Sequence, residues 1–230
     1  MKPLKKAIIF DAGALISLSM NGLTNELVKL KKIFDGSFLI TNQVKSEVID
    51  KPLTIKSFEL EAFRTKKLLD DGILELADDY GFDNCKVEEK AREIMRFANS
   101  FFQGPKGPVN IMHLGEASCL ALSKMLNDKK INNVIVIDER TTRLIIENPE
   151  NLKKIFEKKL HASVSIDVNK LKILKNFKFI RSAELLYIAY ERNLFDLKKD
   201  RTLLDSLLYA VKYTGTSISS GEIEEIKSLS

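Results

Sequence analysis

Metal-binding side chains other than carboxylates are scarce in this sequence. Its 230 residues include two cysteines and two histidines, and tryptophan is absent. A structural zinc site needs about four Cys or His ligands at close spacing. Cys85 and Cys119 have no partner motif, and His113 and His161 do not supply one. The sequence therefore argues against structural zinc, and we expect both cysteines to be free, buried thiols.

Long apolar runs are also missing. No stretch approaches the roughly 18 apolar residues of a membrane-spanning helix. Residues 1–6 pass directly into an apolar segment without the core of a signal peptide. Neither an internal repeat nor a low-complexity linker interrupts the chain. We therefore expect one domain, in the cytoplasm and without membrane contact.

The residues that are present are typical of a soluble globular protein, with 44% hydrophobic and 30% charged residues. The formal net charge is +5 and the pI is about 9.0. A mildly basic surface is compatible with a polyanionic partner but does not demonstrate one. A chain of this length can bury the core of one α/β domain with a helical extension.

Short apolar segments alternate with helical patterns along the chain. Residues 7–10, 37–40, 73–76 and 134–137 predict strands, and residues 177–180 predict a fifth strand at the sheet edge. Strands that alternate with helices indicate a parallel sheet with right-handed crossovers. The sequence therefore predicts an α/β fold.

We expect residues 1–230 to form a single domain whose core covers about residues 6–146. From about residue 147 to residue 230 the pattern changes to an insertion and a set of C-terminal helices. Because no linker separates these helices from the core, we expect them to pack on the sheet.

Four acidic residues stand at positions where α/β proteins bind ligands. Asp11 and Asp138 each end a predicted strand, and ligands bind beyond the carboxyl ends of such strands. Glu47 lies in the helix after the second strand, and Glu116 opens the helix before the fourth. Each also has a structural interpretation, because such acids cap helices, interact with the helix dipole or are simply exposed.

Carboxylates gathered in one crevice repel one another by several kcal/mol at an effective dielectric constant of about 20. Such a cluster implies either raised pKa values or a bound divalent cation. Oxygen ligands and water suit hard ions such as Mg²⁺ or Mn²⁺. The four acids therefore predict metal-assisted hydrolysis of a phosphodiester.

In the order and position of these acids the chain resembles the PIN-domain nucleases. The segments Gly115–Ala117 and Ile137–Arg140 are similar to an archaeal-type subgroup of its VapC-like ribonucleases. The resemblance covers about residues 6–146. The chain departs from the family pattern at Ala12, where many members have Ser or Thr, and in a longer insertion at residues 147–176.

This resemblance implies a three-layer fold, in which a five-stranded parallel sheet lies between helices. It also implies endoribonuclease activity that depends on Mg²⁺ or Mn²⁺, with Asp11, Glu47, Glu116 and Asp138 as catalytic residues and metal ligands. Expected partners are RNA, a second copy of the chain, and an antitoxin or an RNA-processing protein. The alternative is a catalytically weak RNA-binding or assembly subunit that retains the fold.

Three arginines are candidates for contacts with RNA phosphates. Arg140 and Arg143 follow the fourth strand, and Arg181 follows the edge strand. The alternative for all three is an ordinary salt bridge at the surface. Ser118 and Glu139 leave open whether a further acid contributes to the site.

Overall fold

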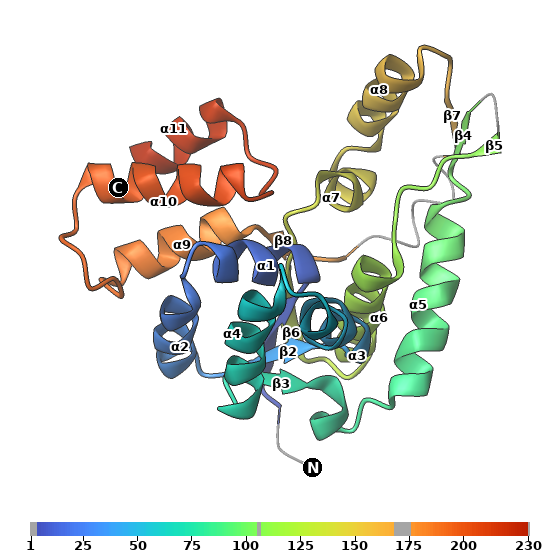
Figure 1. Ribbon diagram of the computed structural model, residues 1–230. Helices are drawn as coiled ribbons and strands as arrows, with labels where there is room; N and C mark the ends of the chain where they lie inside the picture. Colours follow the sequence, from blue (N-terminus) through green and yellow to red (C-terminus); the bar gives the residue numbers. More distant parts are fainter. Residues whose placement is uncertain (1–3, 105–106, 168–175, 230) are drawn as a thin grey trace.

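The computed structural model describes residues 4–104, 107–167 and 176–229. Within these ranges a five-stranded sheet forms the centre, in the order β3-β2-β1-β6-β8, and every neighbouring pair of strands is parallel (Figure 1). The strands are β1 (Lys6–Phe10), β2 (Ser37–Ile40), β3 (Leu74–Leu76), β6 (Asn132–Val136) and β8 (Phe179–Ile180). The predicted α/β fold with a parallel sheet and an edge strand near residue 180 is confirmed.

Helices connect these strands and flank the sheet. In the first part of the chain they are α1 (Ala12–Met20), α2 (Thr24–Ile33), α3 (Asn42–Lys45), the π-helix η1 (Ser46–Asp50), the 3₁₀ turn η2 (Pro52–Thr54), α4 (Glu59–Asp70) and the 3₁₀ turn η3 (Ala77–Tyr80). In the second part they are α5 (Asn84–Ala98), α6 (Leu114–Asp128), α7 (Arg140–Glu147), α8 (Pro149–Leu160), α9 (Ser182–Glu191), α10 (Arg201–Tyr213) and α11 (Ser220–Ser228).

The strand order determines which helices share a face of the sheet. The chain moves from β1 through β2 to β3 in one direction and returns to β6 in the other. Right-handed crossovers then put the connecting helices on opposite faces. In agreement, α4 contacts both α1 and α2, whereas α5 contacts α6, which packs on β1 and β6.

The central strands form because their apolar residues can be buried on both faces at once. In β1 and β2, Ile9, Phe10, Leu39 and Ile40 are completely buried. Phe10 and Phe38 pack edge to face with their ring centres 5.2 Å apart. These strands hold the residues that follow them at fixed positions at the carboxyl end of the sheet.

A second, small sheet was not predicted. It consists of β4 (Phe102–Gly104), β5 (Gly107–Pro108) and β7 (Ser165–Ile166), in the order β5-β4-β7. Helix α5 ends at Ala98, and the side chain of the next residue, Asn99, accepts hydrogen bonds from the backbone N–H groups of residues 111 and 112. Residues 168–175 of the predicted insertion lie outside the described residues.

The C-terminal helices pack on the sheet through α9, which contacts β8 and α1 (Figure 1). α10 contacts α9, and α11 contacts α10. None of the helices in the described ranges is long and apolar enough to cross a membrane. The expectation of two buried thiols is wrong for Cys85, which is exposed, whereas Cys119 is buried.

Candidate functional site

The carboxyl ends of β1 and β6 lie side by side, because these two strands are hydrogen-bonded neighbours. Asp11 directly follows β1, and its backbone N–H donates to the Val136 carbonyl at 3.0 Å. Asp138 comes two residues after the end of β6. Adjacent strands are about 4.8 Å apart. The two aspartates therefore belong to the same end of the sheet, as the sequence predicted.

Asp11 is buried, with 4% of its surface exposed. Its side chain caps α1 by accepting a hydrogen bond from the Gly13 N–H at 3.2 Å. Burial and then the charge of Glu116 raise the pKa of this carboxyl group to about 7; hydrogen bonds from backbone N–H groups oppose the rise, and Glu47 adds to it. The group therefore holds a proton much more firmly than an exposed aspartate does.

Glu47 lies in the π-helix η1, which directly follows α3. π-helical turns are rare and are frequently found at functional sites. The carboxylate rests on the start of α6, because a Cβ atom added at Gly115 would lie 2.6 Å from Glu47 Oε2. Gln43 Nε2 donates to Glu47 Oε1 at 2.7 Å. A residue without a side chain at position 115 thus makes room for this acid.

Glu116 lies in the first turn of α6, where its Oε2 accepts a hydrogen bond from the His113 N–H at 2.8 Å. Partial burial raises the pKa of Glu116, and the charge of Glu139 adds to that rise, while the hydrogen bond from His113 opposes it. Glu116 is therefore both a helix cap and part of a negatively charged group.

The thiol of Cys119 lies within range of the charges of all three acids. It is completely buried, and its Sγ donates to the Phe10 carbonyl at 3.7 Å. Burial raises the pKa of this thiol well above its usual value, and the charges of Asp11, Glu116 and Glu47 raise it further, in that order. The charges of the three carboxylates thus act together on the Cys119 thiol, next to the last residue of β1. We call Asp11, Glu47 and Glu116 the acid cluster.

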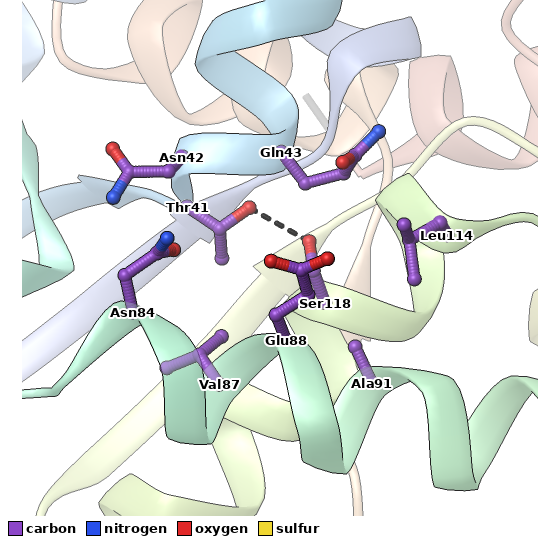
Figure 2. A pocket seen from close by; sticks show the side chains of 9 residues that line it. All are labelled: Thr41, Asn42, Gln43, Asn84, Val87, Glu88, Ala91, Leu114 and Ser118. Atoms are coloured by element: carbon purple, nitrogen blue, oxygen red, sulfur yellow. Dashed lines mark hydrogen bonds between the residues drawn. The ribbon is translucent and has the colours of Figure 1, made fainter.

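A small hollow next to the acid cluster shows how the start of α3 and the start of α6 are held together. It has a volume of about 170 Å³ and lies between the start of α3 and the helices α5 and α6. Figure 2 shows the hydrogen bond across it between the hydroxyl groups of Thr41 and Ser118, at 2.7 Å. Ser118 also donates to the Gly115 carbonyl. These bonds fix the start of α3, and hence Glu47, against the start of α6.

Asp138 has a different environment from the acid cluster. It is 2% exposed, and both carboxyl oxygens accept hydrogen bonds from the chain itself. The Ser182 N–H donates to Oδ1 at 2.8 Å, while the hydroxyl groups of Ser182 and Thr216 donate to Oδ2 at 2.7 and 2.8 Å. This carboxylate anchors the start of α9 and the segment after α10 to the end of β6.

Glu139 is the acid after β6 whose charge acts on Glu116. It also caps α7, since its Oε2 accepts a hydrogen bond from the Thr142 N–H at 2.7 Å. The sequence left the role of Glu139 open because two acids in succession follow the strand, and residue type alone does not tell which one faces the cluster.

The acid cluster offers oxygen donors without a neighbouring cation. Within the described part of the chain, none of Asp11, Glu47 and Glu116 forms an ion pair with Lys or Arg. In the same residues, no three His, Cys, Asp or Glu side chains stand close enough to form a preformed metal site. A negative, oxygen-only group of this kind fits Mg²⁺ or Mn²⁺, which retain several bound waters.

The three arginines predicted to contact phosphates differ in their surroundings. Arg181 is buried and forms ion pairs with Glu184 and Glu222, the latter at 2.6 Å. Arg143 donates to the Ser217 carbonyl at 3.2 Å. Arg140 is exposed. Arg181 and Arg143 therefore interact largely inside the protein, with 10% and 13% of their side chains exposed, whereas Arg140 lies where a ligand can reach it.

No protein-family model, curated protein or solved structure matches this chain. What the site does must therefore be inferred from its own geometry and chemistry.

Proposed function

We propose that the protein is a divalent-metal-dependent endoribonuclease with a PIN-like fold, hydrolysing phosphodiester bonds of RNA at the acid cluster. The observation that carries the proposal is Asp11, a buried carboxyl group whose pKa is raised to about 7 beside two further carboxylates. Burying such a group is unfavourable for folding, so its position is best explained by a ligand that needs it. The strand order and the positions of the acids support the PIN-like interpretation.

Asp11, Glu47 and Glu116 would hold the cation, directly or through water. A bound Mg²⁺ or Mn²⁺ lowers the pKa of a water molecule and stabilises the leaving oxygen of a phosphodiester. Asp138 keeps a supporting role in this proposal: it fixes the end of β6, and Glu139 brings a fourth negative charge towards Glu116. Cys119 does not act as a nucleophile, because it is buried and its thiol holds its proton firmly.

The substrate is proposed to be single-stranded RNA, because its flexible backbone can reach a cluster at the carboxyl ends of the central strands. The net charge of +5 favours a polyanion.

One observation favours a second candidate function, that of an RNA-binding or assembly subunit without efficient catalysis. Among the described residues, the acids do not converge into a preformed three-ligand metal site. If the side chains do not rearrange around a cation, the fold would bind RNA without cutting it.

The deciding experiment measures cleavage of a labelled single-stranded RNA in Mn²⁺, in Mg²⁺ and after adding EDTA. We expect cleavage that disappears with the chelator. In Asp11→Asn it should fall by about 100-fold or more, since electrostatic groups at a reaction centre contribute on this scale. Glu93→Gln, an exposed acid on α5, serves as the matched control and should cleave like the wild type. RNA binding with no cleavage under any of these conditions would favour the assembly subunit.

A second pair of variants tests the geometry of Glu47. In Gly115→Ala the added methyl group would meet the Glu47 carboxylate at 2.6 Å and push it away from α6. We expect the affinity for Mn²⁺ to fall by about 10–100-fold, the range typical of altered support around a metal site. Folding should be preserved because the displaced atoms end a flexible side chain. Gly221→Ala is the control at the same position of helix α11, where the nearest atom lies 3.9 Å away.

A further inference from the structure

A polar cavity of about 510 Å³ lies between α7 and the two last helices, α10 and α11. In Figure 1, α7 stands across from these two helices near the carboxyl ends of the strands. The basic side chains that line the cavity are Arg140 and Arg143 from α7 and Lys212, near the end of α10. We call the space that these three line the basic cavity.

The cations of the basic cavity are only partly neutralised by the protein. Arg140 is exposed and forms no hydrogen bond or ion pair with the residues that the structure describes. The Nε atom of Arg143 is buried and has no hydrogen-bond partner among them. Lys212 donates to the Ser220 hydroxyl, a neutral group. Arg140 therefore offers guanidinium N–H groups that can donate to an oxygen acceptor in the cavity.

Two acids also line the cavity, but neither cancels its positive charge. Glu222 pairs with Arg181 at 2.6 Å. Glu147 reaches Arg143 only at 3.9 Å, the limit of an ion pair, and its side chain is 46% exposed. Glu222 is thus already paired with the buried Arg181, although its charge still acts on Arg143. The cavity retains a surplus of positive charge.

The basic cavity adjoins the acid cluster. Thr216 lines it and donates its hydroxyl hydrogen bond to Asp138, at the end of β6. Arg140 directly follows Glu139, whose charge acts on Glu116. A chain that passes from the cavity to the acid cluster therefore crosses only the ends of two neighbouring strands.

We propose that the basic cavity binds a backbone phosphate of the RNA strand, next to the bond that the acid cluster cleaves. This inference rests on the proposed ribonuclease function. Guanidinium groups present several donors in a plane that matches phosphate oxygens, and lysine adds a compact charge. The C-terminal helices, which supply Lys212 and Thr216, thereby form part of the substrate site.

The test measures binding of a labelled 12-nucleotide single-stranded RNA by fluorescence anisotropy in EDTA, so that no cleavage occurs. Arg140→Gln and Lys212→Gln should each reduce the slope of log K against log salt by about 0.7, the value for one lost contact to a single strand. At 0.1 M salt this corresponds to about fivefold weaker binding. Arg201→Gln, an exposed arginine at the other end of α10, removes the same charge and should leave the slope unchanged.

Equal loss of affinity in Arg140→Gln and Arg201→Gln would overturn the proposal, because binding would then follow net charge alone. Titration with inorganic phosphate and pyrophosphate tests whether the cavity binds a free phosphate compound instead of the RNA backbone. If Arg140→Gln lowers the affinity for these ions but leaves the affinity for RNA unchanged, the cavity binds a free phosphate compound, and the RNA assignment is wrong. Since the titrations need no cleavage, failure of the nuclease assignment in the Asp11→Asn experiment is recognised separately.

Discussion

Two aspartates at the ends of neighbouring strands show how differently one residue type can be used. Asp11 and Asp138 are both almost completely buried. Asp138 accepts three hydrogen bonds from Ser182 and Thr216. Asp11 accepts one from the Gly13 N–H and faces Glu116 and Glu47 instead. The Asp138 carboxyl group holds the fold together. The Asp11 carboxyl group carries an unfavourable interaction that the proposed cation would relieve.

This difference predicts how stability depends on pH. The pKa of Asp11 rises from 3.8 in the unfolded chain to about 7 in the folded protein. Between these values the folded state binds a proton that the unfolded state lacks, so its contribution to stability is full below pH 3.8 and is lost as pH rises through 7. The loss is on the order of 4 kcal/mol, at 1.36 kcal/mol for each pKa unit.

We therefore expect Asp11→Asn, measured in EDTA, to unfold at a higher temperature than the wild type at pH 8, and by a much smaller margin at pH 5. Adding Mn²⁺ at pH 8 should raise the melting temperature of the wild type only, because the cation replaces the missing neutralisation. Thermal unfolding followed by circular dichroism checks both statements. A wild type and variant with parallel pH profiles would contradict this account.

At the scale of elements, the sequence predicted the strands and helices that a local pattern of apolar residues determines. Uninterrupted apolar segments located β1 and β2, and helices filled the intervals between strands. Locating these elements also located the Asp and Glu residues of the site, because each lies within a few residues of a strand or helix end. The basis for these predictions is that burial on both faces of a parallel sheet leaves a continuous apolar signature in the chain.

What the sequence could not predict depends on contacts between distant residues. The hydroxyl donors of Asp138 come from positions 44 and 78 residues further along the chain. The small sheet joins β4 to β7, which are far apart in the sequence. A hydrogen bond between such segments leaves no periodic trace, so the sequence did not reveal the donors that surround Asp138.

The segment after α10 therefore carries a prediction of its own. Thr216→Val keeps the shape of the side chain but removes one donor from the buried Asp138 carboxylate. We expect the free energy of unfolding to fall by about 1–3 kcal/mol, the range for hydrogen bonds to charged groups and for unsatisfied buried acceptors. Urea denaturation measures the change. Ser217→Ala is the control, since Ser217 bonds to Asp138, Arg143 and Arg181 through its backbone groups; an equal loss there would rule out the Thr216 hydroxyl as the cause.

At the scale of the whole molecule, Arg181 joins the C-terminal helices to one another. It precedes α9, pairs with Glu184 on that helix and with Glu222 on α11, and donates to the Ser217 carbonyl. Although partial burial of the guanidinium lowers its pKa, the hydrogen bond and charge of Glu184 raise it overall. One buried side chain thus fixes α9, α11 and the segment between α10 and α11.

This connection should be sensitive to acid. Partial burial raises the pKa of Glu222, but hydrogen bonds from Ser219 and Arg181 and the charge of Arg181 lower it to about 2. A lowered pKa contributes stability that is present above the unfolded value of 4.5 and lost as pH falls through 2. The wild type should therefore exceed Glu222→Gln in urea midpoint at pH 6, and this advantage should vanish near pH 2. A difference that is the same at both values would exclude the ion pair as its origin.

The long separation between Asp138 and Thr216 also has a consequence for protein synthesis. A ribosome releases β1, α6 and β6 well before α10, so a nascent chain complete only to α8 already contains every member of the acid cluster. It still lacks the donors that hold Asp138 and the wall that carries Lys212. The residues proposed to cleave RNA are thus translated before those proposed to bind the strand, and α10 and α11 complete the proposed substrate site.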